Sequence, residues 1–204
     1  MRVRDIMAEP GVVARADTPV KAAAGMLVEH GVTALPVVDS EDRLLGEVTE
    51  LDLVRNRFPR DPRYSGGAEE HGEPPPGVVG ELISPRITGI DPETDVTDLV
   101  RGLLEERVRS VPVVEEGRLV GMVTGRDLVR TLARDDDLLA RDISYRLSFV
   151  GGPRRWSVEV DEGTALIVDA YDSAEDRHVA RVLAESVPGV LRAHCTAAAA
   201  EENE

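Results

Sequence analysis

The apolar positions of this chain follow a pattern that occurs twice within the first 134 residues. In each copy, apolar residues recur at helical spacing and are followed by two short apolar runs that are typical of strands. The helical positions are Val20, Ala23, Ala24, Leu27 and Val28 in the first copy, and Val96, Leu99, Val100, Leu103 and Leu104 in the second. The strand runs are 35–38 and 44–48, then 111–114 and 119–123. Each copy is therefore predicted to read strand, helix, strand, turn, strand, helix.

The two copies also share individual residues at a nearly constant spacing. Segments 46–55 and 121–130 both read Gly, two spacer residues, Thr, two more, Asp, Leu, Val, Arg, at an offset of 75 residues. Segments 31–38 and 107–114 align at an offset of 76 residues and both end in Pro-Val-Val. Matches in one order at nearly one offset indicate a duplicated domain of roughly sixty residues.

The first helix of each copy is predicted to end differently. Gly31 stands where a left-handed C-cap belongs, because glycine adopts a positive φ without steric cost. Arg107 occupies the aligned position in the second copy, so a different cap is predicted there.

From Asp135 onward the periodicity changes and predicts a third domain with the order αββαβ. The carboxylates at 135–137 favour a helix start, because the N-terminal end of a helix carries partial positive charge. Two alternating strands follow, with predicted core positions Trp156, Val158 and Val160 on one and Leu166, Val168 and Ala170 on the other. Ser173 is predicted to cap a helix with buried positions Val179, Val182, Leu183 and Val187, before a last strand at 190–195.

Proline and glycine crowd the stretch 58–77, which is predicted to be an exposed loop or linker. It serves either as a lid or partner-binding segment, or as a spacer between the duplicated units. The expected organisation is therefore two repeats at 1–57 and 78–134, a third domain at 135–196 and a disordered tail at 197–204.

Composition narrows the classes of function. The net charge of −15 repels polyphosphate backbones, so a nucleic-acid partner is not expected. No apolar run approaches the ~20 residues that span a membrane, and the N-terminus lacks the apolar core of a signal peptide. The single cysteine, Cys195, excludes an internal disulfide. Together these features predict a cytoplasmic protein.

The shared Thr-x-x-Asp element is the strongest candidate for chemistry. Thr49 and Thr124 each follow an apolar strand and precede a helix, whose free N–H groups suit a phosphate. Asp52 and Asp127 follow one turn later, where a carboxylate can accept both hydroxyls of a ribose. The same spacing is also that of an ordinary capping box, which would make both residues purely structural. Occurrence in both copies favours a nucleoside phosphate site.

These motifs resemble those of CBS domains, so residues 1 to about 134 look like a tandem CBS pair, or Bateman module. The matching elements lie at 31–38, 46–53 and 121–128, with Arg107 departing from the pattern. The resemblance implies a mixed α/β (α+β) fold with pseudo-twofold symmetry and two clefts for adenosyl ligands such as AMP, ADP, ATP or S-adenosylmethionine. No cofactor is implied as a requirement.

The resemblance also assigns roles to individual residues. It implies that Asp52 and Asp127 hold ribose and that Thr49 and Thr124 approach phosphate. Arg126 or Arg130 is expected to reach phosphate oxygens, unless each is simply a solvated surface residue. Further lining residues would be Ala34, Pro36, Ser110 and Pro112 around the base, with Val13 and Thr88 completing the walls. Glu50 brings negative charge beside the first Thr and Arg126 positive charge beside the second, so the second site is predicted to bind phosphate better.

The third domain is similar to BON domains, on its αββαβ order, the Asp-Glu-Gly-Thr turn at 161–164 and Val-Pro-Gly-Val at 187–190. That family implies contact with envelope proteins or phospholipid. The acidic balance of residues 135–196, 12 acidic against 7 basic, fits a lipid headgroup site poorly. Arg154–Arg155 beside Trp156 is the candidate for such a site, and the alternative is an ordinary pair at the sheet edge.

No catalytic residue and no metal site is predicted, because the four histidines are scattered and none has a ligand partner at metal-binding spacing. The leading hypothesis is a non-enzymatic regulatory protein that binds an adenine nucleotide, dimerises through its CBS pair and signals through the BON-like domain to an unknown protein or weak lipid partner. One alternative is a structural scaffold with empty clefts. The other, an enzyme acting on its nucleotide, has no motif in its favour.

Overall fold

The computed structural model describes residues 1–55, 57–58, 63, 75–83, 89–152, 154–171 and 173–198. Most of the stretch 58–77, Thr88 and the residues after 198 lie outside this range, so the predictions made for them are not addressed. The chain forms two compact units, one of residues 7–124 and one of residues 125–204 with residues 1–6. Both contain helices and strands, which confirms the predicted α+β class.

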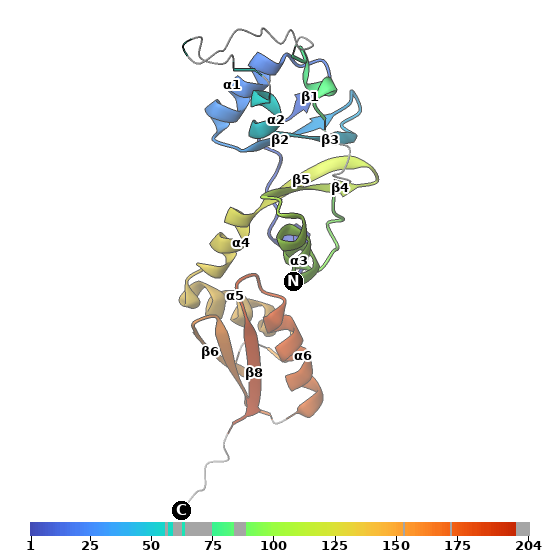
Figure 1. Ribbon diagram of the computed structural model, residues 1–204. Coiled ribbons are helices and arrows are strands. Elements are labelled where there is room, and N and C mark those ends of the chain that lie inside the picture. Colours follow the sequence, from blue (N-terminus) through green and yellow to red (C-terminus); the bar gives the residue numbers. More distant parts are fainter. Residues whose placement is uncertain are drawn as a thin grey trace, which may run out of the picture. The chain divides into compact units, whose positions relative to one another are not determined.

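The first repeat is a three-stranded sheet covered by two helices. Its strands are β1 (Ala14–Arg15), β2 (Ala34–Val38) and β3 (Leu44–Thr49), and its helices are α1 (Val20–His30) and α2 (Glu50–Val54). β1 runs parallel to β2, and β3 returns antiparallel to it. Figure 1 shows both helices against this sheet. Aliphatic side chains fill the core between them: Ala23, Leu27, Leu35, Val48 and Leu53 are all buried.

The second repeat has the same strand order. It contains α3 (Val96–Glu106), β4 (Ser110–Glu115) and β5 (Arg118–Thr124). Ile90 pairs in parallel with Val113 as Ala14 pairs with Val37 in the first repeat, so the bridge at Ile90 corresponds to β1. The helix that follows β5, α4 (Gly125–Leu132), belongs to the other compact unit.

Backbone hydrogen bonds join the two repeats within residues 7–124. The segment before α1 pairs with β5, because Ala8 and Met122 exchange N–H···O bonds of 3.0 and 2.9 Å. The 3-10 turn Val79–Glu81 lies instead against the first repeat, where Val79 donates to the Thr18 carbonyl at 2.9 Å and is fully buried. Each repeat is thus completed by a segment that precedes the other repeat's helix.

The sequence-based prediction of a different cap at Arg107 is wrong. Arg107 adopts φ 55° and ψ 33°, nearly the conformation of Gly31 at φ 62° and ψ 32°. The chain must turn in the same way to enter β2 and β4, so the duplicated topology imposes the left-handed conformation on a non-glycine residue. This conformation costs an L-residue roughly 1–2 kcal/mol.

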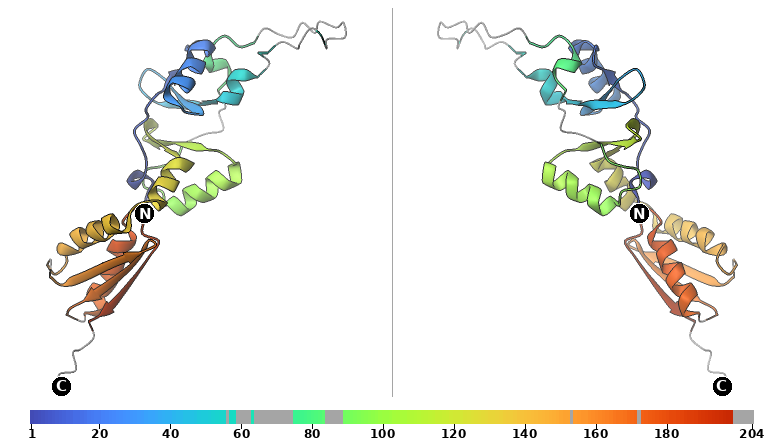
Figure 2. Two further views of the ribbon diagram at one scale, coloured as in Figure 1. Left: turned by 90° about the vertical axis from the view of Figure 1, so that its left-hand side faces the viewer. Right: turned by 90° about the vertical axis from the view of Figure 1, so that its right-hand side faces the viewer.

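The second unit contains α4 and a domain with the predicted αββαβ order. Its elements are α5 (Asp136–Ser148), β6 (Trp156–Asp161), β7 (Thr164–Asp169), α6 (Ala174–Glu185) and β8 (Arg192–Ala197). β7 is the central strand, antiparallel to β6 and parallel to β8. Figure 2 shows α5 and α6 beside this sheet, and their buried side chains join one core with its strands. Ser173 caps α6, as predicted, and Asp135 caps α5 within the run of carboxylates predicted to favour a helix start.

One predicted core face in this domain is wrong, and a second is wrong in part. On β7 the buried residues are Ala165, Ile167 and Asp169, whereas Leu166 and Val168 are exposed. The hairpin register explains the difference, because Val158 pairs with Ile167 and cross-strand partners share a face. On α6 the predicted Val179 and Val182 are exposed, and Ala180 and Ala184 are buried instead, because their small side chains let the helix pack closely. The predicted Leu183 and Val187 do pack in the domain core.

Arg155 is buried in an ion pair rather than exposed at the sheet edge. Its guanidinium is 8% exposed and binds both oxygens of Asp169, at 2.8 and 3.0 Å, and Asp176 at 2.7 Å. It also lies over the rings of Trp156 and Tyr171. These bonds hold the pKa of Asp169 well below its usual range. Arg155 is therefore a structural ion pair inside the domain.

Candidate functional site

The first Thr-x-x-Asp element forms a capping box at the end of β3. The Asp52 carboxylate accepts from the Thr49 backbone N–H at 2.9 Å and from its hydroxyl at 2.6 Å, and the Asp52 N–H donates to Thr49 Oγ1 at 3.3 Å. The other carboxylate oxygen binds Arg55 at 3.2 Å. The Asp52 side chain is 17% exposed and that of Arg55 70% exposed. One Asp52 oxygen is thus held by the fold, and the other by a solvated arginine.

The second element repeats the aspartate–arginine pairing. Asp127, the third residue of α4, binds Arg130 at 3.0 Å, and the two side chains are 11% and 69% exposed. The arginine of each pair is largely exposed, so water screens the interaction and a ligand hydroxyl could displace either arginine at modest cost. Each aspartate therefore combines a nearly buried carboxylate with one readily exchanged partner.

Strand register brings the predicted base-lining segments next to the threonines. Ala34 lies directly opposite Thr49, and Ser110 lies directly opposite Thr124. The Glu50 N–H also donates to the Thr33 carbonyl at 3.1 Å, which ties the end of β3 to the start of β2. The two segments that the family resemblance assigns to base and phosphate thus meet at the same end of each hairpin.

The remaining predicted residues lie as follows. Pro36 and Pro112 are buried in β2 and β4, and Val13 is half-buried one residue before β1. Arg126 is exposed on α4. Thr88 is outside the described residues, but its neighbour Gly89 borders a cavity in the second repeat.

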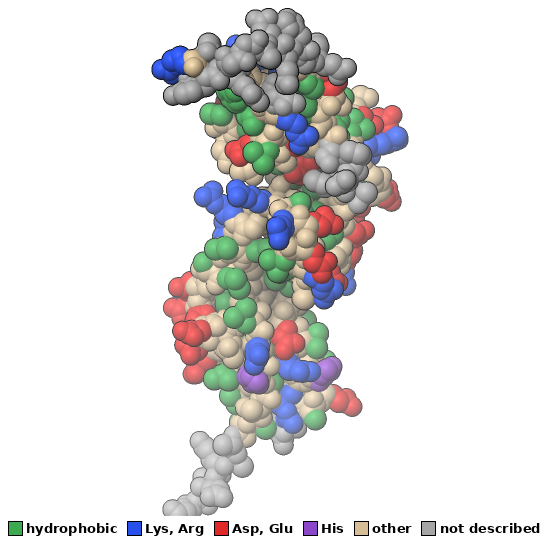
Figure 3. Space-filling view, in the orientation of Figure 1, with side chains coloured by type: hydrophobic (Ala, Val, Ile, Leu, Met, Phe, Trp, Pro, Cys, Tyr) green, Lys and Arg blue, Asp and Glu red, His purple; other side chains and the backbone are tan. Residues whose placement is uncertain are grey.

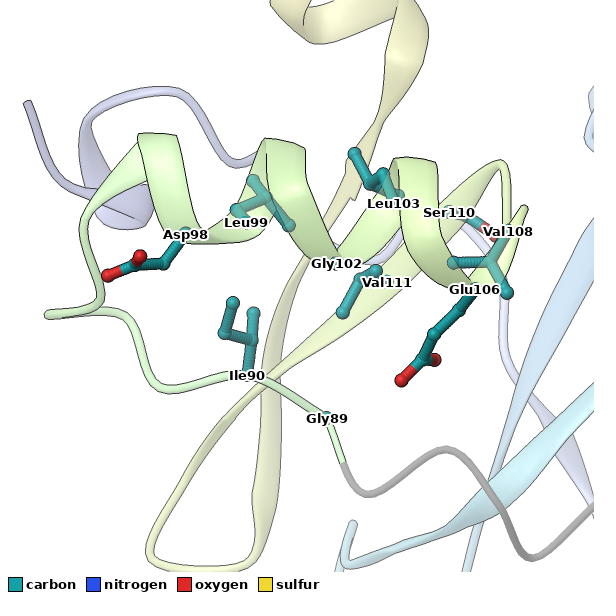
Figure 4. Close-up of a pocket in the computed structure, with 10 residues that line it drawn as sticks. All are labelled: Gly89, Ile90, Asp98, Leu99, Gly102, Leu103, Glu106, Val108, Ser110 and Val111. Atoms are coloured by element: carbon teal, nitrogen blue, oxygen red, sulfur yellow. The ribbon is translucent and has the colours of Figure 1, made fainter.

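That cavity has a volume of about 160 Å³ and is lined by α3, β4 and the segment at Gly89 and Ile90. Figure 4 shows apolar side chains of α3 and β4 around it, with the carboxylates of Asp98 and Glu106 at opposite ends. Ser110 also borders it. Ligand pockets are typically about 300–1,000 Å³, so this cavity alone is too small for a nucleotide.

Sequence reasoning missed Glu47, a buried carboxyl beside the predicted base-lining residues. Glu47 is 3% exposed, lies opposite Pro36 in the hairpin and accepts a hydrogen bond from the Ser110 hydroxyl at 3.3 Å. Burial raises the pKa of Glu47 to about 7, and the negative charge of Asp52 adds to the rise. The available signal was a glutamate inside an apolar strand, at the position where the second copy has Met122.

The described surface carries charges of both signs. On the face seen in Figure 3, small groups of basic side chains lie between acidic ones. Among the residues with described positions, no group of three or more His, Cys, Asp or Glu side chains is placed to hold a metal ion. No helix in the described part of the chain is long and apolar enough to cross a membrane.

The duplicated sheet-and-helix units and their repeated Thr-x-x-Asp elements define a tandem CBS pair. The family model for the CBS domain matches residues 3–58 and 79–134, so the chain belongs to the CBS domain family. Hypoxic response protein 1 of Mycobacterium tuberculosis is 33% identical over 129 residues, which are 63% of this chain and 83% of that protein. The chloroplastic CBS domain-containing protein CBSX2 of Arabidopsis thaliana is 33% identical over 139 residues, 58% of this chain and 57% of that protein.

Solved structures show the same relationship. The crystal structure of Hypoxic Response Protein I with two coordinated zinc ions has a TM-score of 0.51 and 32% identity, and covers 64% of this chain and 98% of that one. The structure of CBSX2 in complex with AMP has a TM-score of 0.50 and 30% identity, over 63% of this chain and 93% of that one. Both matches cover somewhat less than two thirds of this chain.

Proposed function

We propose that this protein is a non-enzymatic regulatory sensor whose CBS pair binds an adenosyl ligand, AMP, ADP, ATP or S-adenosylmethionine. The observation that carries the proposal is the duplicated aspartate at the end of a strand–turn–helix element. Asp52 and Asp127 are each nearly buried and each held on one side by a solvated arginine. The complex of CBSX2 with AMP supports the assignment of this ligand class.

In this proposal the parts of each element have separate tasks. The aspartate accepts the two ribose hydroxyls and releases Arg55 or Arg130, which is then available to a phosphate oxygen. Thr49 and Thr124 approach the phosphate, and the segments at Ala34 and Ser110 line the base. The ligand acts as a signal only if it binds two arrangements of the protein with different affinity.

The two sites are proposed to differ in strength. Glu50 follows Thr49 directly, whereas Gly125 and Arg126 follow Thr124. A phosphate at the second element therefore meets positive charge where the first presents negative charge, so the second element binds the more highly phosphorylated nucleotide more tightly.

Isothermal titration of the full chain with AMP, ADP, ATP and S-adenosylmethionine at moderate salt tests the proposal. We expect micromolar binding of at least one of the four, weakened at least tenfold in Asp127→Ala and less in Asp52→Ala. Absence of binding by all four would favour the scaffold alternative, in which the elements are helix caps. Turnover of bound ATP that survives rigorous purification would instead favour an enzyme.

A homodimer through the CBS pair is part of the proposal. Val28 on α1 and Leu104 on α3 occupy equivalent positions in the two repeats and are 84% and 74% exposed. Large aliphatic side chains exposed at matched positions support a face that a second copy covers. Sedimentation velocity should show a dimer that the double substitution Val28→Asp with Leu104→Asp converts to a monomer.

The C-terminal domain is proposed to pass the ligand signal to a partner, as a BON-like module. Its αββαβ order supports that comparison, and the exposed Leu166 and Val168 offer an apolar sheet face to a protein. Burial of Arg155 removes the strongest basic candidate for a lipid headgroup. Sedimentation with anionic phospholipid vesicles should therefore leave the protein in the supernatant.

A further inference from the structure

Glu47 and Ser110 form a polar contact across the two repeats that has no counterpart at the symmetric position. Glu47 lies on β3 of the first repeat, and Ser110 lies on β4 of the second. The residues aligned with them in the other repeat are Met122 and Ala34, which are apolar. The carboxyl–hydroxyl contact therefore occurs only at the base-lining segment that contains Ser110 and not at the one that contains Ala34.

The contact is buried and incompletely satisfied. Glu47 Oε1 accepts from the Ser110 hydroxyl at 3.3 Å, whereas Glu47 Oε2 has no hydrogen-bond partner among the described residues. Ser110 is 7% exposed and is also one of the residues that line the cavity beside α3. A buried polar atom without a partner costs free energy. Protonation of Glu47, or a ligand group that bonds to Ser110, therefore changes the stability of this pair.

The protonation state of Glu47 decides which way the Ser110 hydroxyl points. An ionised carboxylate can only accept, so it accepts a hydrogen bond from the Ser110 hydroxyl and leaves the lone pairs of the Ser110 oxygen for other groups. A protonated carboxyl can donate to Ser110, which leaves the hydroxyl proton of Ser110 available for donation. Ser110 thus presents an acceptor in one state of Glu47 and a donor in the other.

We propose that Glu47 is a positioning residue that sets the hydrogen-bonding polarity of Ser110, so that the base-lining segment of the second repeat selects a purine bearing an exocyclic amine over one bearing a ring carbonyl. This inference rests on the proposed nucleotide-binding function. Ionised Glu47 makes Ser110 an acceptor for the N–H of adenine. Protonated Glu47 makes Ser110 a donor suited to the carbonyl of hypoxanthine.

The surroundings of Glu47 place this change near neutral pH. Burial raises its pKa to about 7, and Asp52 on α2 is the charged group that adds to the rise. Two further residues face Glu47: Pro36 on β2 and Ser110 on β4. Neither carries a group that changes its charge near neutral pH. The selection for an amine is therefore expected to be strong at pH 8.0 and weak at pH 5.5.

The test is calorimetric titration of the full chain with AMP and with IMP at pH 5.5 and pH 8.0. The phosphate titrates alike in both nucleotides, so its protonation cancels in the ratio of their dissociation constants. We expect wild-type protein to prefer AMP over IMP about tenfold more strongly at pH 8.0 than at pH 5.5. A ratio that is independent of pH while AMP binds would overturn this inference and leave the proposed function intact. Failure of both nucleotides to bind would overturn both.

Variants separate a positioning role from a merely structural one. Glu47→Gln should abolish the pH dependence of the ratio, because its amide does not titrate. Glu41→Gln, which changes an exposed carboxyl in the turn between β2 and β3, should keep the wild-type dependence. Ser110→Ala should lose the preference for AMP at both pH values. This variant tests the inference by itself if Glu47→Gln fails to fold. Wild-type behaviour in either Glu47→Gln or Ser110→Ala would contradict the inference.

Discussion

Asp52 accepts two hydrogen bonds from Thr49, from its backbone N–H at 2.9 Å and from its hydroxyl at 2.6 Å. The same carboxylate is the proposed ribose ligand, so one side chain both caps α2 and recognises the nucleotide. The capping and binding interpretations of Thr-x-x-Asp are therefore compatible, since they use different oxygens of one group. The cap fixes the carboxylate in place before any ligand arrives.

Removing the Thr49 hydroxyl should destabilise the first repeat. Thr49→Ala deletes the acceptor of the Asp52 N–H and should lower the free energy of unfolding by about 1 kcal/mol. Thr49→Ser retains the hydroxyl and should lose less than half as much. Urea unfolding monitored by circular dichroism measures the stability of both variants. Equal losses in Thr49→Ala and Thr49→Ser would show that the Thr49 hydroxyl contributes nothing to stability.

Glu47 should make the protein less stable as the pH rises. Its pKa is raised from 4.5 to about 7 in the folded state, so between these values the folded protein holds a proton that the unfolded chain has lost. Stability attributable to this group is therefore fully present below pH 4.5 and lost by about pH 7. The loss is on the order of 3 kcal/mol.

Glu47→Gln isolates this effect from the general repulsion of an acidic chain. The difference in free energy of unfolding between the variant and wild type should shift in favour of the variant as the pH rises from 4.5 to 7. Parallel stability curves over that range would contradict the assignment of Glu47 as the titrating group.

The left-handed C-caps provide a matched pair of substitutions. Arg107→Gly relieves the strain at φ 55° and should stabilise the protein by about 1 kcal/mol. Gly31→Ala imposes that strain on the aligned position and should destabilise by a similar amount. Thermal unfolding tests both, and a destabilising Arg107→Gly would mean that the arginine side chain stabilises the cap by more than the strain costs.

Breaking the buried ion pair should damage the C-terminal domain. Asp169→Ala leaves the Arg155 guanidinium buried without its bidentate partner and should lower the melting temperature by roughly 10 °C or more. Because the pKa of Asp169 is lowered, its contribution is present above its ordinary pKa and is lost as the pH falls through the lowered value. Glu159→Ala, on the exposed edge of β6, is the matched control and should change the melting temperature little.

Much of the fold could be predicted because the duplication repeats each signal. The strands around Pro36 and Pro112, the helices and the Thr49 cap all follow from local periodicity and spacing. The faces of β7 and α6 could not, because Leu166 and Ile167 are equally apolar and the choice depends on the register with β6. Local patterns do not encode the register of a strand pair.

In the candidate site, too, the residues of a local motif could be predicted and those that depend on distant contacts could not. Thr49, Asp52 and their equivalents are evident from one repeated motif. Glu47 became a candidate only with the structure, because its environment depends on Ser110, which is 63 residues away in the sequence. Arg155 shows the converse, since a pair of arginines beside a tryptophan gave no indication of the distant Asp169 that binds one of them.

The central claim, an adenosyl ligand held by the two repeated aspartates, is tested most directly by titrating AMP into wild-type protein and the Asp52→Ala, Asp127→Ala double variant. We predict micromolar binding to the wild type and a loss of at least a hundredfold in the double variant, with thermal melts confirming that the variant is folded. Undiminished affinity in a folded double variant, or no binding by the wild type, would contradict the claim.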